Sequence, residues 1–416
     1  MRINLSGRHR NACPNDAGIA VRIDRNTHPK HALASIGAAA LVMSSSALAQ
    51  DQIEWSGFGS IAAGMTTGSD DQLFGYDNDL DFNPGSLFAL QAKANLSDKL
   101  SVTTQIMSRG SEDFDLGVEW AYLQYQLTDS ASINVGKLRL PFYMYSDYLD
   151  VGYSYHWLRT PQSVYRVPFD NYTGVSFQHN AFVGDFTFNT QVVAGNMQDD
   201  INVIGGETAE AELNNLIGFN TSAIYSNLTM RVAYYQTNDA NISTDTLTTD
   251  INGQEVNIGD FLDSLTLAGL EGVANELDAS EDKGTFAGVG VMYDNFDWFV
   301  GAEYTELELE NSYVPKQRSA YLTAGKRFDS WALHATYGKT DDKVMSPERF
   351  TVPDPQLQAF VNQAANIVVT ETAYTSIGVN FNIAPSAVLK FDVTHADDKL
   401  TDESDVLASA AVQFVF

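Results

Sequence analysis

The sequence predicts an all-β fold, a transmembrane antiparallel β-barrel of sixteen strands. Runs of about ten residues alternate apolar side chains with polar or small ones, as strands between lipid and a watery interior require. Short turns alternate along the chain with long loops, which is typical of membrane barrels. After residue 49 no stretch reaches the roughly 18 consecutive apolar residues of a membrane helix, which excludes a helical membrane protein.

Residues 1–49 have the features of a signal peptide. Lys30 and His31 precede an apolar run at 32–42, and the segment ends in Ala47-Leu48-Ala49, a small-x-small pattern that signal peptidases accept. The run is too short for a membrane-spanning helix, which needs roughly 20 residues; a short buried helix is the alternative. Residues 1–27 lack an apolar pattern, which favours a translation start assigned too far upstream. We expect residues 50–416 to form the barrel as one domain.

The predicted strands each have one apolar face. In the last of them, Val412, Phe414 and Phe416 alternate with Ala411 and Gln413. We predict strands near 52–66, 86–96, 99–110, 116–127, 131–141, 171–181, 185–196, 213–225, 228–238, 284–293, 296–307, 315–328, 331–341, 371–383, 387–397 and 406–416.

The connections determine which kind of sheet these strands form. The largest loops are 142–170, 239–283 and 342–370, and helical spacing within the last two predicts short helices near 260–277 and 355–367. Because a bilayer offers no water to an open sheet edge, the sheet has to close. A barrel of sixteen strands keeps an aqueous bore, whereas about eight strands would be filled by side chains.

Composition excludes several classes of function. A net charge of −29 argues against nucleic-acid binding, which needs a basic footprint, and 44% hydrophobic residues argue against disorder. The single cysteine, Cys13, lies in the signal segment. Asp77, Asp79 and Asp81 have calcium-loop spacing, but Phe82 replaces the required glycine, so a solvated acidic loop competes with calcium bridging to lipopolysaccharide. We expect no cofactor and no resident metal.

Several motifs resemble the Gram-negative outer-membrane porin superfamily. They are EWAYLQY at 119–125, VGKLRLP at 135–141, SDYLDVGY at 146–153 and the terminal AVQFVF at 411–416. The resemblance implies a sixteen-stranded porin domain at 50–416 in the cell outer membrane, usually a homotrimer, surrounded by lipid and lipopolysaccharide. It also implies that the third extracellular loop, here 142–170, folds inward as a constriction.

Charged residues on the inward register are the candidates for a pore lining. Strand alternation points Lys93, Arg109, Arg231 and Lys390 inward, and Arg139 joins them unless a bulge near Gly136 reverses it. A basic wall facing loop carboxylates would concentrate anions at the narrow point, and scattered solvated charges are the alternative. The candidate residues are Lys93, Arg109, Arg139, Asp147, Asp150, Arg159, Arg166, Arg231 and Lys390.

These features predict a passive diffusion channel for small hydrophilic solutes or ions. No phosphate-binding loop or nucleophile motif is evident, and we predict neither catalytic residues nor enzymatic activity. The alternative is an outer-membrane receptor or adhesin that uses the long loops 239–283 and 342–370.

Overall fold

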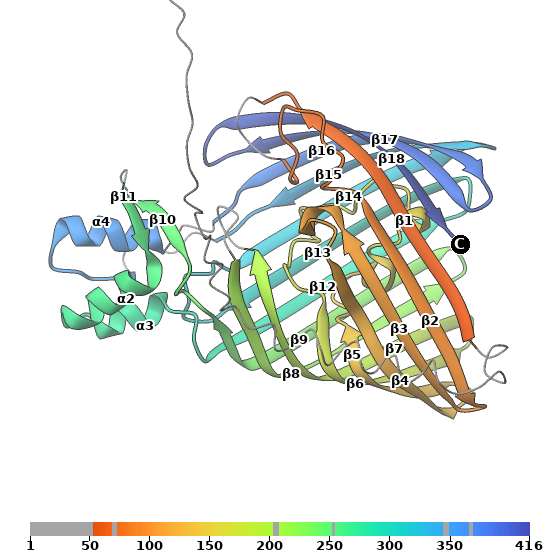
Figure 1. Ribbon diagram of the computed structural model, residues 1–416, viewed down its shortest axis with the longest axis horizontal. Coiled ribbons are helices and arrows are strands. Elements are labelled where there is room, and N and C mark those ends of the chain that lie inside the picture. Colours follow the sequence, from red (N-terminus) through yellow and green to blue (C-terminus); the bar gives the residue numbers. More distant parts are fainter. Residues whose placement is uncertain (1–52, 69–72, 203–207, 252–253, 344–348, 366–368) are drawn as a thin grey trace, which may run out of the picture. The chain divides into compact units, whose positions relative to one another are not determined.

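The computed structural model describes residues 53–68, 73–202, 208–251, 254–343, 349–365 and 369–416. The predicted signal peptide lies outside these residues. Sixteen antiparallel strands form a closed barrel in which β1 pairs with both β2 and β18 (Figure 1). Among the described helices, none is both long and apolar enough to cross a membrane.

The barrel strands confirm the predicted number and order. They are β1 (Ile53–Thr66), β2 (Leu87–Ser97), β3 (Leu100–Arg109), β4 (Leu116–Thr128), β5 (Ala131–Arg139), β6 (Asn171–Val183), β7 (Phe186–Asn202), β8 (Thr208–Tyr225), β9 (Leu228–Ile242), β12 (Asp282–Asp294), β13 (Trp298–Leu309), β14 (Gln317–Arg327), β15 (Trp331–Thr340), β16 (Thr372–Ala384), β17 (Ala387–Asp398) and β18 (Glu403–Val415). The β7–β8 hairpin is longer than predicted because its ladder continues to the pair Asn202 and Thr208.

The two longest loops contain regular structure of their own. Helices α2 (Ile258–Leu267), α3 (Glu271–Leu277) and α4 (Pro355–Ala364) lie where helical spacing predicts them. Asn257 caps α2 by accepting a hydrogen bond from the backbone N–H of Asp260, and Asp354 caps α4 immediately before a proline at the first helical position. The hairpin of β10 (Thr248–Ile251) and β11 (Gln254–Asn257) was not expected from the sequence.

The two faces of the barrel follow the predicted alternation. In β17 the inward side chains of Lys390, Asp392 and Thr394 are buried, whereas Phe391 and Val393 on the outer face are exposed. Aromatic side chains lie beside the short turns, where the rings of Phe328 and Trp331 stack with centroids 4.0 Å apart. An apolar outer band bordered by aromatic residues suits a membrane environment.

Glycine and aromatic residues together close the barrel between β1 and β18. Gly57 and Phe416 exchange two backbone hydrogen bonds of 2.9 Å. A Cβ atom on Gly57 would lie 2.3 Å from the Phe416 ring, and one on Gly59 would lie 2.7 Å from the Phe414 ring. The terminal aromatic rings therefore occupy the space that side chains would take at these two glycines.

The main hydrophobic cluster includes the connection between β5 and β6. This third loop, residues 140–170, contributes buried side chains such as Leu140, Phe142 and Trp157. Leu265 of α2 and Val361 of α4 belong to the same cluster. The third loop and the helices of the longer loops are thus connected through one apolar core.

Candidate pore constriction

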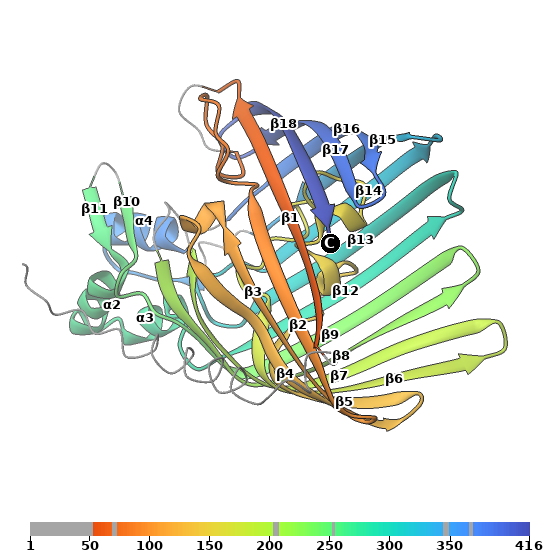
Figure 2. The same ribbon diagram turned by 45° about the vertical axis from the view of Figure 1, so that its right-hand side comes forward.

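The third loop contacts the inner face of the strands opposite its origin. The Tyr165 hydroxyl donates to Glu303 of β13 at 2.8 Å, and the Trp157 indole N–H donates to Thr336 of β15 at 2.8 Å. The backbone N–H of Leu158 donates to Asp392 of β17 at 3.0 Å. In Figure 2 this yellow segment is seen within the ring of strands. These contacts join the loop to side chains of β13, β15 and β17.

Lys390 binds the third loop from the barrel wall. Its Nζ atom donates to the carbonyl oxygens of Gly152, Tyr155 and Trp157 at 2.7, 2.6 and 2.6 Å, and only 1% of the residue is exposed. An ammonium group has three N–H donors, so all of them are used. The inward register predicted for Lys390 is confirmed, but the residue is a backbone anchor and not a free charge in the interior.

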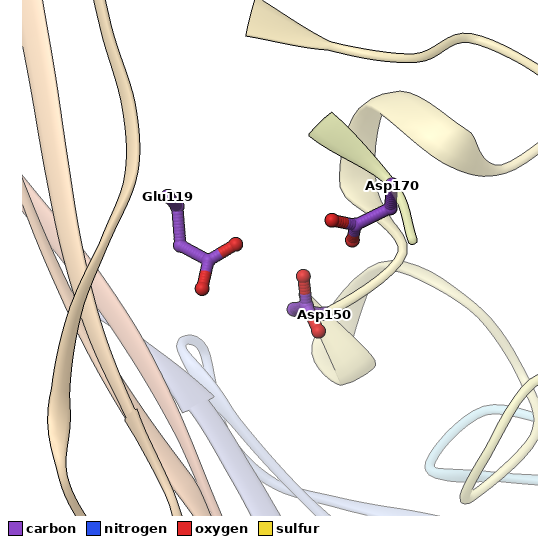
Figure 3. A group of neighbouring side chains, drawn as sticks. All are labelled: Glu119, Asp150 and Asp170. Atoms are coloured by element: carbon purple, nitrogen blue, oxygen red, sulfur yellow. The ribbon is translucent and has the colours of Figure 1, made fainter. Parts of the chain in front are cut away.

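Five charged side chains meet where the third loop leaves and rejoins the wall. We call Arg109, Glu119, Arg139, Asp150 and Asp170 the charged cluster. Nη2 of Arg139 lies 2.6 Å from Asp150, 3.0 Å from Asp170 and 3.4 Å from Glu119. Arg109 contacts Glu119 at 2.5 Å and Asp150 at 3.4 Å. Figure 3 shows the wall carboxylate of Glu119 facing those of Asp150 and Asp170.

Glu119 is a member that the sequence analysis missed as a site residue. A bulge in β4 explains its position, because Gln105 pairs with Trp120 while the next residue, Ile106, pairs with Val118. Glu119 is therefore an extra residue, and both it and Trp120 are directed inward. The sequence did contain a signal for this position. A glutamate between the outward-facing Val118 and Ala121 is expected to face the interior, because a charge facing lipid is unfavourable.

Arg139 reaches the charged cluster from the last position of β5, three residues after the unusual Gly136. Gly136 has φ +141°, and a Cβ atom there would lie 2.3 Å from the Ala121 carbonyl oxygen. Beyond it, the pairing of β4 with β5 ends at Ala121 and Lys137. The uncertainty that the sequence left at Gly136 is resolved with Arg139 on the inside.

Burial and charge act in opposite directions on the two loop carboxylates. Burial raises the pKa of Asp170 to about 6, which Arg139 opposes and neighbouring Asp150 and Glu119 reinforce. Burial also acts to raise the pKa of Asp150, but the guanidinium groups of Arg139 and Arg109 outweigh it and lower that pKa. The three carboxylates lie close enough to hold a metal, yet both guanidinium groups already engage them, so the arrangement is an ion-pair network.

Three other predicted basic residues hold loops in place. Arg231 donates to the Pro141 carbonyl oxygen at 2.6 Å. Arg166 forms an ion pair with Asp342, which lies just after β15. The guanidinium carbon of Arg159 lies 5.2 Å from the ring centroid of Tyr76, an arrangement that favours a cation–π interaction. Arg231 and Arg166 are engaged by protein oxygens and Arg159 is buried against aromatic rings, so the three do not form an open basic surface.

The sequence analysis left open whether inward basic residues form a wall, and Lys93, Arg109 and Lys390 do not form one. Lys93 faces inward from β2, where its partner on β3 is Thr103. Arg109 pairs instead with Leu87, which lies six positions earlier on β2 than Lys93. At a rise of about 3.3 Å per residue, the two side chains lie at different depths of the barrel. Asp147 lies apart from both, beside a cavity that Arg231 also borders.

Cavities with charged residues in their walls lie on both sides of the third loop. One of about 420 Å³ is bordered by Arg109, Asp150 and Tyr155. Another of about 450 Å³ is bordered by Tyr155 together with Asp294 and Arg327, near the short turns. Both cavities include Tyr155 in their walls, and the charged cluster borders the first of them through Arg109 and Asp150.

Solved structures with the same architecture cover most of this chain. The outer membrane channel DcaP of Acinetobacter baumannii matches with TM-score 0.55 and 10% identity, over 88% of this chain and 97% of that one. The anion-selective porin from Comamonas acidovorans matches with TM-score 0.54 and 10% identity, over 88% and 99%. This chain has the sixteen-stranded porin fold.

A further structure with the porin fold is that of OmpT, an outer membrane protein of Vibrio cholerae, with TM-score 0.53 and 12% identity over 89% of this chain and 100% of that one. No protein-family profile and no curated protein sequence matches the chain. The resemblance noted in the motifs is thus confirmed through the porin fold, a closed β-barrel of the kind found in bacterial outer membranes.

Proposed function

We propose that this protein is a passive diffusion channel of the outer membrane for small hydrophilic solutes and ions. The observation that carries the proposal is the charged cluster near Tyr155, with a cavity that contains charged residues on either side of the third loop. Solutes pass from one cavity to the other along this cluster. The proposal includes no enzymatic activity, and movement follows the concentration gradient.

The charges at this point favour cations weakly. Two guanidinium groups face three carboxylates in the charged cluster. Arg231, Arg166 and Lys390 bind protein partners, and Lys93 lies at a different depth of the barrel. The chain as a whole has a net charge of −29, so the water near its acidic loops is enriched in cations. This replaces the anion enrichment that a basic wall would have produced.

Planar-bilayer recordings of the purified protein test both statements. Discrete conductance steps in potassium chloride are expected, with a reversal potential in a salt gradient that shows a modest preference for potassium. The preference weakens at high salt because screening shortens the range of the charges. Membranes that stay silent with folded, inserted protein would exclude a channel.

Trimer formation is part of the proposal, and the outer face near the barrel closure supports it. Small residues such as Ala63, Ala92 and Ala410 face outward on neighbouring strands β1, β2 and β18, which allows another barrel to approach closely. Mass photometry in detergent tests this association: the trimer mass supports it, and a monomer at all concentrations contradicts it.

A surface receptor is the second candidate because the long loops form a folded unit. Side chains of α2, α3 and α4 share one hydrophobic cluster, and Arg349 forms an ion pair with Glu276 of α3 at 2.6 Å. Leu267 at the end of α2 is 90% exposed. Replacing 243–280 with a short linker separates the candidates: a channel keeps its conductance steps, whereas a receptor loses adhesion or ligand capture by whole cells.

A further inference from the structure

An apolar chamber lies beside the cavities described above. Its volume is about 390 Å³, and it is bounded by the third loop and by the inner faces of β7, β8, β9, β12 and β13. The apolar lining includes Phe142, Phe169, Leu216, Phe286 and Leu307. Inner faces of channel barrels are usually polar, so a chamber of this lining requires an explanation.

Packing of the loop helices accounts for only part of this apolar surface. Buried residues such as Leu265 and Val361 belong to the same hydrophobic cluster as Phe142 and Leu216. The chamber remains as open volume despite that packing, and 300–1,000 Å³ is roughly the range of small-molecule pockets. Its size therefore suits a molecule with one or two rings.

The charged groups of the chamber wall are already neutralised. Arg166 forms an ion pair with Asp342, and Glu308 forms an ion pair with Lys316 at 2.8 Å. An ionised ligand would find no free counter-charge on these two residues and would lose its hydration, which is costly. The chamber therefore selects against ions.

Aromatic packing separates the chamber from the cavity that contains Asp147. The Phe142 ring lies 4.6 Å from the Phe286 ring and 5.0 Å from the Tyr235 ring, measured between centroids. The Tyr235 hydroxyl also donates to the Pro141 carbonyl oxygen at 2.9 Å. The chamber is thus a side pocket, and aromatic edges and faces line it in the geometry that favours another ring.

We propose that this chamber binds a small uncharged aromatic molecule. The inference goes beyond passive diffusion, because it assigns a saturable binding site next to the route for hydrophilic solutes. Retention of such a molecule depends on the apolar walls and does not require ion flow. Its failure would leave the conductance proposal untouched, and silent bilayers would leave the binding result valid.

Binding of 1-naphthol to the protein in lipid nanodiscs tests the proposal, with empty nanodiscs subtracted and 1-naphthoate as the matched anion. Equilibrium dialysis should show one saturable site for naphthol, with naphthoate at least about tenfold weaker. Absence of saturable binding, or naphthoate bound as tightly as naphthol, would overturn the proposal.

A cavity-filling variant locates the site. Leu307→Trp places a larger ring in the chamber and should weaken naphthol binding by about tenfold or more. Leu333→Trp, on the exposed outer face of β15, is the matched control and should bind like the parent. If Leu307→Trp does not fold, as judged by the gel band of a folded barrel that shifts on heating, Leu213→Trp fills the same chamber from another wall position. Unchanged binding in a folded, filled variant contradicts the assignment.

Discussion

Nη2 of Arg139 lies 2.6 Å from Oδ2 of Asp150, joining the end of β5 to the middle of the third loop. Asp170, immediately before β6, contacts the same nitrogen at 3.0 Å. One guanidinium group thereby connects both ends of the loop to its centre. We expect the stability of the barrel and the position of the loop to depend on this group.

Arg139→Met should destabilise the protein by about 3–5 kcal/mol, because it leaves buried carboxylates without their counter-charge. Urea unfolding in lipid vesicles, followed by tryptophan fluorescence, measures the change. Arg318→Met is the control, since Arg318 pairs with Glu306 on the exposed outer side and such pairs contribute at most about 1 kcal/mol. An equal decrease in the free energy of unfolding for the two variants would contradict a structural role for the charged cluster.

Cation preference should decline as pH falls through about 6, where Asp170 takes up a proton and the charged cluster loses its excess negative charge. The raised pKa means that folding favours the protonated carboxyl, so the stability contributed by this group is present at low pH and lost as pH rises toward 6. Reversal potentials at about pH 5 and about pH 7.5 measure the effect on selectivity.

The variant Asp170→Asn should abolish this pH response and give the low-pH selectivity at both pH values. Asp185→Asn, in the exposed β6–β7 turn, should retain it. A response that persists in Asp170→Asn would assign the titration to another group.

Lys390→Met should release part of the third loop, because three buried carbonyl oxygens lose their donor, at about 1–3 kcal/mol each. We expect noisier and larger conductance steps, and protease cleavage near 152–157. Lys326→Met, on the exposed outer face of β14, should behave like the parent. If the Lys390→Met channel shows conductance steps without added noise and resists the protease, other contacts are sufficient to hold the third loop.

Gly136→Ala should lower the yield of folded barrel, since alanine at a φ of +141° is strained by about 1–3 kcal/mol and its Cβ meets a backbone oxygen of β4. Gly272→Ala is the control, because no heavy atom lies within 4 Å of the added Cβ in α3. The yield of folded barrel in both variants is measured after refolding, from the fraction of protein whose gel migration changes on heating. Normal folding of Gly136→Ala would mean that β5 relaxes at this point.

Strand positions were predictable because each barrel strand alternates between lipid and interior. That regularity also identified the inward side of Arg109, Arg231 and Lys390 before any coordinates. The hairpin β10–β11 was not predictable in the same way, since its strands of four residues are too short to show a period.

The charged cluster was only half predictable, and local backbone irregularity is the reason. Glu119 enters it through a bulge that strict alternation does not describe, and Arg139 enters it from the last position of β5, where the sequence left its direction open. Lys390 was placed on the correct face, but its role as an anchor depends on carbonyl oxygens of a loop that no sequence period locates.

The hydrogen bonds between Gly57 and Phe416 have a consequence for biogenesis. They join the two ends of the barrel domain, so they are among the contacts with the largest sequence separation, and such contacts form slowly. Until Phe416 has been delivered, β1 and β18 both present unpaired edges that other chains can recruit. The pairing of β1 with β18 therefore completes the barrel, and an assembling chain remains vulnerable to aggregation until these two strands meet.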